Sequence, residues 1–243
     1  MERRRILQIL AAGATSFWAK QLPASALLAP AAQERPQPEP LLPLFPLELV
    51  LFPRTNLPLH IFEERYKEMI HDCLENHWEF GILLVQEKSV EQIGCTASIS
   101  QVLRRYPDGR MDILVRGRRR FEIADLNQDK SYLRGKPQFF EDDETNPPTE
   151  ALRQEAIQLY SRLVTLADSE DPSRKDRSPT FSDQLLSFQL MTGLPASPVW
   201  RQALLELRSE RERLERVMGY LQHLIEYLEH RGDPDKGAPT GTA

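Results

Sequence analysis

Residues 42–53 read LPLFPLELVLFP, and residues 57–66 read LPLHIFEERY. Large apolar residues fill both stretches, and proline recurs at positions 43, 46, 53 and 58. Proline has no backbone N–H and holds φ near one value, so a strand with several prolines loses part of its hydrogen-bond ladder. The pattern predicts edge strand, bend and loop rather than a central strand. We expect this segment to be buried against another part of the chain and to lead into a helix.

The spacing of apolar residues changes beyond this segment. A stripe with a spacing of three to four residues, which includes Phe62, predicts a helix at about 61–74, and the run FGILLV at 80–85 predicts a buried strand. The turn YPDGR at 106–110 predicts a hairpin. Its second strand would place five apolar residues on one face: Met111, Ile113, Val115, Phe121 and Ile123. Helical periods predict helices at 149–167 and 181–191, and one continuous helix at 199–231.

These elements predict an α+β fold in two parts. Residues 41–146 are expected to form a mostly antiparallel β-domain with one early helix. Residues 147–231 are expected to form a helical subdomain that ends in a long helix. The stretch QERPQPEP at 33–40 is typical of an extended linker, and the Gly- and Pro-containing stretch at 232–243 is typical of a disordered tail.

Residues 1–32 have two interpretations. Arg3 and Arg4 precede a weakly apolar stretch and then small residues, an order that resembles a twin-arginine export signal. A genuine signal of this kind would place the protein in the periplasm or cell envelope. A disordered leader, or a mis-assigned start codon, would leave it in the cytoplasm.

Composition narrows the class of protein. The chain has 243 residues, of which 40% are hydrophobic and 28% are charged, and its net charge is −5. It is long enough to bury a core, and its negative charge argues against bulk attraction to nucleic acid or to an anionic membrane. No apolar run reaches the roughly 18–20 residues of a membrane-spanning helix. Cys73 and Cys95 cannot make a disulfide framework, and we interpret both as small buried hydrophobic residues.

Several motifs, taken in order, resemble a known family. They are FEERY (62–66), FGI (80–82), PDG (107–109), DILVRGRRRF (112–121) and RQALLE (201–206). Their order and spacing resemble the N-terminal substrate-binding domain of the Lon protease over about residues 40–230. The resemblance implies a PUA-like β-barrel with one early helix, followed by a helical bundle.

The same resemblance implies a function. In Lon this domain engages protein substrates ahead of an ATPase and a Ser-Lys peptidase. The sequence has no Gly-x-x-x-x-Gly-Lys-Ser/Thr loop, so we expect no enzyme activity and no cofactor. The expected function is a non-catalytic module that binds unfolded or extended polypeptide, or a protein partner, as an adaptor or chaperone-like factor. An apolar surface or an open strand edge would make the contact, and the sequence does not identify its residues.

Arginines of the hairpin offer an alternative function. The hairpin carries Arg104, Arg105, Arg110, Arg116, Arg118, Arg119 and Arg120. If its second strand alternates, Arg116, Arg118 and Arg120 leave from one face, as contact with phosphates requires. The alternative is therefore an RNA-binding accessory domain that uses the hairpin from Arg104 to Arg120. The net negative charge and the lack of interleaved aromatic residues favour solvated arginines that pair with acidic neighbours.

Other chemical groups do not form a recognisable site. No Gly-x-Ser-x-Gly motif for a nucleophile is present. His223, Glu226 and His230 lie near one side of the last predicted helix, and we interpret them as a solvated polar face rather than a metal site. His60 has no partner motif, so we interpret it as structural.

Overall fold

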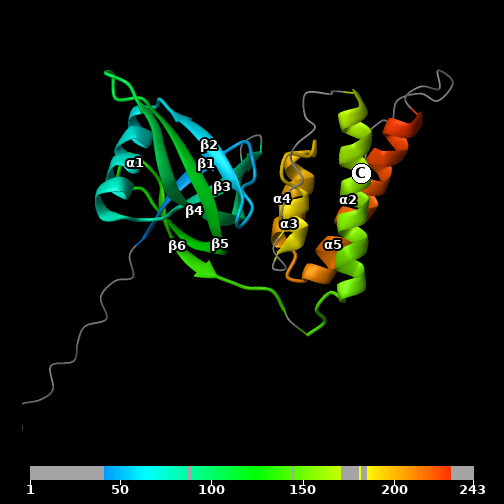
Figure 1. Cartoon of the computed structure of the whole chain (residues 1–243). Coiled ribbons are helices and arrows are strands. Elements are labelled where there is room, and N and C mark those ends of the chain that lie inside the picture. The colour runs from blue at the N-terminus through cyan, green and yellow to red at the C-terminus, as the bar shows by residue number, and fades with distance from the viewer. Residues whose placement is uncertain (1–40, 87–88, 144, 171–180, 182–184, 231–243) are drawn as a thin grey trace, which may run out of the picture. The chain divides into compact units, whose positions relative to one another are not determined.

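The computed structural model describes residues 41–86, 89–143, 145–170, 181 and 185–230 (Figure 1). The leader predicted at 1–32, the linker at 33–40 and the tail at 232–243 lie outside the described residues. Within the described part, six strands and one early helix are followed by four helices. None of these helices is long and apolar enough to cross a membrane.

The strands form one sheet that closes on itself. They are β1 (Leu42–Leu47), β2 (Asn56–Ile61), β3 (Phe80–Gln86), β4 (Ser89–Arg105), β5 (Met111–Asn127) and β6 (Arg134–Phe139). Their order is β2-β5-β4-β3-β1-β6, and β6 also pairs with β5. β5 pairs with β2 along its first half and with β6 along its second half. A closed ring therefore consists of β5, β4, β3, β1 and β6, and β2 lies outside it. Only β1 and β3 run parallel among these pairs, so the predicted mostly antiparallel β-barrel is confirmed.

The two strands of the proline-rich entry segment, β1 and β2, behave differently. β2, with Pro58, lies at the open edge of the sheet and pairs with β5 alone, as predicted. β1 has neighbours on both sides, so the prediction that its prolines exclude a central position is wrong. The reason is that different residues of β1 pair with the two neighbouring strands. Leu42 and Pro43 pair with β6, whereas Leu44–Leu47 pair with β3.

The first helix, α1 (Glu64–Asn76), buries the face that the sequence predicts. Tyr66, Met69, Ile70 and Cys73 point into the core. Phe62 is an exception, because it precedes the helix and 59% of its surface is exposed. The apolar stripe therefore begins at Tyr66.

The β4–β5 hairpin confirms the predicted turn but not the predicted alternation. Gly109 has φ 82, and its N–H donates to the Tyr106 carbonyl at 3.0 Å. Farther along, Ala97 pairs with Gly117 but Cys95 pairs with Arg120, so β5 carries one extra residue there. Residues of β5 after this β-bulge therefore lie on the opposite face from the one that simple alternation predicts. All five predicted residues are buried, but Phe121 and Ile123 join Leu42, Leu44 and Leu83 in a separate, smaller core cluster.

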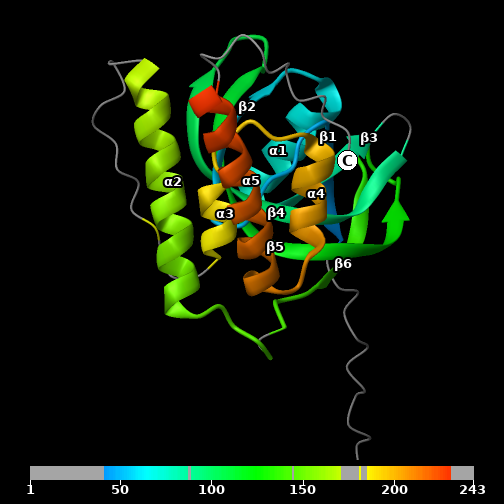
Figure 2. The same ribbon diagram turned by 90° about the vertical axis from the view of Figure 1, so that its right-hand side faces the viewer.

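The helices are α2 (Glu150–Glu170), α3 (Leu186–Leu190), α4 (Pro198–Glu206) and α5 (Glu210–His230). The prediction for α2 is confirmed, and Thr149 accepts a hydrogen bond from the Leu152 N–H as its N-cap. Of the helix predicted at 181–191, the structure describes a helix only at 186–190. α5 packs against α2 and α3 (Figure 2).

The predicted continuous helix at 199–231 is wrong, because it is broken at 207–209. Leu207 is extended, with ψ 133, and Ser209 caps α5 by accepting a hydrogen bond from the Glu212 N–H at 3.2 Å. The break leaves the Leu207 and Arg208 carbonyls available to other donors. The Asp143 N–H donates to the Arg208 carbonyl, and two arginines donate to the Leu207 carbonyl.

The main core is shared by the barrel and the helices. Phe52, between β1 and β2, stacks on Phe188 of α3 with ring centroids 4.8 Å apart. Both rings belong to one cluster of buried residues that also includes Ile113 of β5 and Leu214 of α5. The proline-rich entry is therefore buried against the helices, as expected. A division into subdomains at 146/147 stays a prediction.

Candidate functional site

An apolar pocket lies where the segment between β1 and β2 meets the beginning of α4. Its volume is about 320 Å³, and we call it the α4 pocket. The walls are mostly apolar: Leu49, Val50, Leu51, Phe52, Leu57, Ala196 and Pro198. Its polar lining consists of Thr55, Asn56, Thr192 and Arg201. A mostly apolar wall with a few polar groups is typical of ligand pockets.

Backbone hydrogen bonds hold one wall of the α4 pocket on β5. The Arg54 N–H donates to the Gly117 carbonyl, and the Gly117 N–H donates to the Thr55 carbonyl, both at 2.9 Å. Thr55 Oγ1 donates to the Phe52 carbonyl at 2.8 Å. A Cβ atom at Gly117 would lie 2.1 Å from the Phe52 carbonyl oxygen, so this close approach requires glycine.

Replacement of Gly117 by alanine is expected to destabilise the protein by about 1–3 kcal/mol, because a backbone oxygen cannot rotate away from the new methyl group. The matched control is Gly219→Ala in α5, where nothing lies within 4 Å of the added Cβ. That change is expected to stabilise the protein by roughly 0.5–1 kcal/mol, since alanine favours a helix. Urea unfolding of both variants measures the difference. Equal effects of the two substitutions would contradict the close approach.

Arg201 is the one cation that lines the α4 pocket. One of its terminal nitrogens donates to the Leu194 carbonyl at 2.6 Å, and its guanidinium lies 5.7 Å from the centroid of the Phe52 ring. Burial lowers the pKa of this half-buried guanidinium, and Tyr220 partly opposes the change. Within the described residues, no carboxylate forms an ion pair with Arg201. Arg201 therefore places a positive charge in an apolar wall.

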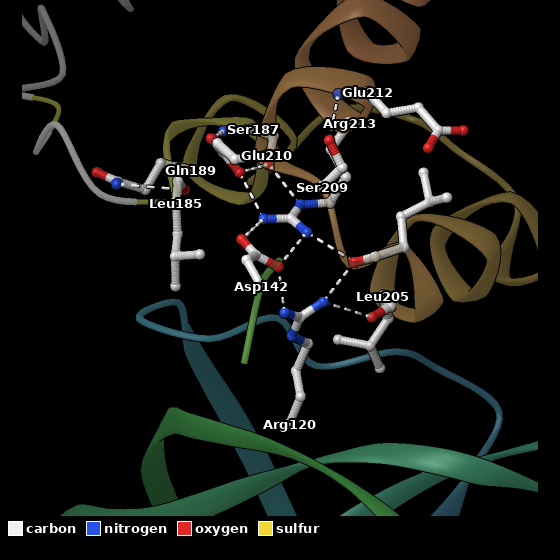
Figure 3. A network of polar contacts seen from close by, with 11 residues as sticks. Arg120, Asp142, Leu185, Ser187, Gln189, Leu205, Ser209, Glu210, Glu212 and Arg213 are labelled. Atoms are coloured by element: carbon white, nitrogen blue, oxygen red, sulfur yellow. Dashed lines mark hydrogen bonds and ion pairs between the residues drawn. The ribbon is translucent and has the colours of Figure 1, made fainter. Parts of the chain in front are cut away.

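Four charged residues fix α4 and α5 on the barrel (Figure 3). Asp142 accepts from both Arg120 of β5 and Arg213 of α5, and Glu210 accepts from Arg213 at 2.6 Å. Both arginines also donate to the Leu207 carbonyl, at 2.5 Å and 2.7 Å. The two cations and two anions balance one another. We call these four residues the ion network.

Burial and pairing act in opposite directions on the ion network. Side chains of Arg120 and Arg213 are only 3% and 0% exposed. Burial alone would raise the pKa of Asp142, but hydrogen bonds and charges from the two arginines outweigh it and lower the pKa. Asp142 is therefore ionised in the folded protein at neutral pH. Its partners lie 22 and 71 residues away, so no local pattern in the sequence reveals this network.

The structure separates the three arginines of the predicted basic patch. Arg116 and Arg118 are exposed, whereas Arg120 is 4% exposed. The expectation that Arg120 shares their solvent face is wrong, because the bulge turns it toward the helices. Arg116 and Arg118 instead line a second pocket of about 470 Å³ with Arg54, Glu79 and Arg119.

This second pocket retains some features of an anion site. Arg118 lies 3.7 Å from Glu79, and the Arg119 guanidinium lies 3.8 Å from the centroid of the Phe139 ring. Phe139 is 43% exposed, so one aromatic side chain does accompany the arginines. RNA binding at this surface stays a prediction.

A larger pocket, about 660 Å³, lies on the barrel beside α1 and is lined in part by Arg65, Tyr66, Lys130 and Tyr132. Its two cations already have partners. Arg65 pairs with Glu63 at 2.8 Å, and Lys130 pairs with Asp72 at 2.6 Å. The α4 pocket is therefore the better candidate for a charged ligand.

His60, for which the sequence offers no partner motif, lies against Asp112. Its Nδ1 lies 2.6 Å from Asp112, which also accepts from the Tyr106 hydroxyl at 2.8 Å. This exposed cluster lies across β2 and β5 and is consistent with a structural role. Nδ1 of His230 donates to the Glu226 carbonyl, and no group of three metal-ligating side chains occurs among the described residues.

Cys73 and Cys95 are buried, as expected, and both thiols are free. Burial raises the pKa of each thiol to about 12. A thiolate is therefore disfavoured at both positions, which agrees with the interpretation as small hydrophobic residues.

The described part of the chain matches a known protein family. Residues 41–223 match the model of the ATP-dependent protease La (LON) substrate-binding domain. The chain is 29% identical over 201 residues to Lon protease 2 of Herpetosiphon aurantiacus and 28% identical over 197 residues to Lon protease 1 of Hydrogenovibrio crunogenus. These alignments cover 77% and 75% of the chain but only 24% and 23% of the relatives. The chain thus spans about a quarter of their length.

Solved structures agree with this match. The crystal structure of the Lon N-terminal domain protein from Xanthomonas campestris superposes with a TM-score of 0.58 at 26% identity, and covers 74% of this chain and 98% of that one. The N-terminal domain of the Mycobacterium avium complex Lon protease has the same TM-score, 0.58, at 18% identity, and covers 75% and 98%. The second similarity concerns the fold alone.

Proposed function

The chain belongs to the family of the Lon substrate-binding domain, and on that premise we propose that it binds polypeptide chains without cleaving them, as an adaptor or chaperone-like factor. The matched region corresponds to the N-terminal part of Lon and not to its ATPase or protease parts. The α4 pocket is the observation that carries the proposal. It offers a concave apolar wall, and apolar side chains of an unfolded chain fit such a wall.

Pairing of a peptide with the strand edge is the weaker alternative. The open edge of the sheet is β2, which contains Pro58 near its centre. Proline on an edge strand removes a donor and protects the edge against pairing with another chain. We therefore assign binding to the pocket rather than to the edge.

A titration of the full chain with reduced, carboxymethylated α-lactalbumin tests the proposal. Saturable binding at micromolar concentration is expected. Ala196→Trp should fill the α4 pocket and weaken binding about tenfold, since one well-packed apolar anchor contributes 1–2 kcal/mol or more. Fluorescence anisotropy of the labelled protein measures the affinity.

Ala203→Trp is the matched control, because Ala203 lies in α4, which begins two residues after Ala196, but is exposed and outside the pocket. It should leave binding unchanged, and both variants should retain the far-UV circular dichroism of the parent. Lack of saturable binding by the parent protein would contradict the proposed function. Equal loss in both variants would contradict its assignment to the α4 pocket.

A further inference from the structure

Arg201 differs from the two buried arginines of the ion network, Arg120 and Arg213. Arg120 and Arg213 each contact a carboxylate of the ion network. Arg201 contacts the Leu194 carbonyl, the Phe52 ring and Tyr220, none of which carries a negative charge at neutral pH. A guanidinium offers five N–H donors, and one hydrogen bond to a neutral carbonyl uses one of them.

A cation in this setting favours an incoming carboxylate. The guanidinium has already lost part of its hydration, as the lowered pKa indicates, so an anion would recover electrostatic energy at little further desolvation cost. The planar fork of arginine also matches the two oxygens of a carboxylate. The α4 pocket therefore selects for negative charge beside an apolar group.

The volume of the α4 pocket limits which part of a polypeptide can supply the negative charge. A volume of about 320 Å³ lies at the lower end of the range for ligand pockets, about 300–1,000 Å³. An internal Asp or Glu next to an apolar residue would have to bring two side chains and the backbone on both sides. The last residue of a chain carries an apolar side chain and a carboxylate on one Cα atom, and the backbone leaves in one direction only.

We propose that the α4 pocket binds the C-terminal residue of a polypeptide, with its apolar side chain against Val50, Phe52 and Leu57 and its terminal carboxylate on Arg201. This inference rests on the proposed function and deepens it, since it names the chain end as the preferred ligand. Internal apolar segments of an unfolded protein would bind the same walls without the ion pair, and hence more weakly.

Three synthetic peptides test the inference with the full chain. The first is Gly-Ser-Gly-Ser-Leu-Leu with a free C-terminus, the second is its C-terminal amide, and the third is the amide of Gly-Ser-Gly-Asp-Leu-Leu. Amidation should weaken binding about tenfold, because it removes a charge-assisted hydrogen bond to Arg201. The third peptide should bind no better than the second.

Two arginine variants locate the effect. Arg201→Gln keeps a donor for the Leu194 carbonyl but removes the charge, and it should abolish the difference between the free acid and the amide. Arg216→Gln is the matched control, since Arg216 is exposed and pairs with Glu212 on α5. It should retain the full difference. Thermal unfolding of each variant shows whether the fold is intact, and Arg201→Lys, which keeps the charge, should keep part of the preference.

The outcomes separate this inference from the proposed function. If carboxymethylated α-lactalbumin binds but the acid and the amide bind equally, the inference fails and the proposed function stands. If the aspartate peptide binds as well as the free acid in an Arg201-dependent manner, the pocket reads a side chain rather than a chain end, and the inference is overturned. If neither the protein probe nor any peptide binds, both fail. Loss of the preference in Arg216→Gln would also overturn it.

Discussion

Replacement of Asp142 by alanine is expected to destabilise the protein by about 3–5 kcal/mol, because it leaves Arg120 and Arg213 buried with one carboxylate between them. Breaking a buried pair costs more than the pair itself contributes, since the remaining charge cannot recover its hydration. A loss of this size is a large fraction of the usual stability of about 5–15 kcal/mol. Urea unfolding of the purified variant, followed by circular dichroism, measures it.

The matched control is Asp129→Ala, which removes an Asp–Arg pair whose carboxylate is exposed. It should have little effect, as is usual for surface ion pairs. Arg120→Met combined with Asp142→Ala supplies a double-mutant cycle, and the two changes should be non-additive because the side chains are in contact. Additive effects, or a small loss in Asp142→Ala, would contradict the ion network as a stabilising feature.

The pH dependence of stability gives the ion network an independent signature. The pKa of Asp142 is lowered in the folded state, so its contribution is present above the unfolded pKa of about 3.8. The contribution is lost as pH falls through the lower, folded pKa. Asp142→Ala should therefore differ most from the parent near neutral pH and least at the acidic end of a urea-unfolding series. A constant difference across this range would contradict the assignment.

Replacement of Phe188 by alanine is expected to cost about 3–5 kcal/mol, the usual range for removing a buried aromatic ring. Phe188 is 0% exposed and stacks on Phe52, and the Arg213 guanidinium lies 4.5 Å from its ring centroid. The ring therefore joins the barrel, the helices and the ion network. Thermal unfolding monitored by circular dichroism measures the loss.

Phe62→Ala serves as the control for Phe188→Ala, because it removes the same ring from a position that is 59% exposed. A change of less than about 0.5 kcal/mol is expected for such a surface position. Similar losses of stability in both variants would show that the Phe52–Phe188 stack contributes no more than an exposed ring.

Local chemistry made much of the fold predictable. Pro107, Asp108 and Gly109 define a turn by their backbone preferences, and the alternation around them predicts the hairpin. The break at 207–209 does have a local signal, because Ser209 and Glu212 have the spacing of a capping box. The bulge after Gly117 was not predictable, because both possible faces carry residues that can be buried.

The candidate site was less predictable than the fold, since it depends on distant residues. Asp142 lies in an acidic run that is typical of the end of a domain. Its role as a buried acceptor is visible only in the structure, where Arg120 and Arg213 both donate to it. In the sequence, Arg201 resembles the other arginines of the stretch predicted as one helix at 199–231. Its significance comes from its apolar surroundings and from the lack of a carboxylate partner within the described part of the chain, neither of which a single sequence reveals.

The way the barrel closes has a consequence for folding order. β4 and β5 adjoin in sequence and pair at once through a short turn, whereas β1 and β6 meet through Leu42 and Pro43 only, with most of the barrel between them in the chain. Contacts between distant segments form late, because the entropy of closing a long loop opposes them. We expect this two-residue pairing of β1 with β6 to form last during folding and to open first. Its opening would expose the smaller cluster around Phe121 while the main core stays intact.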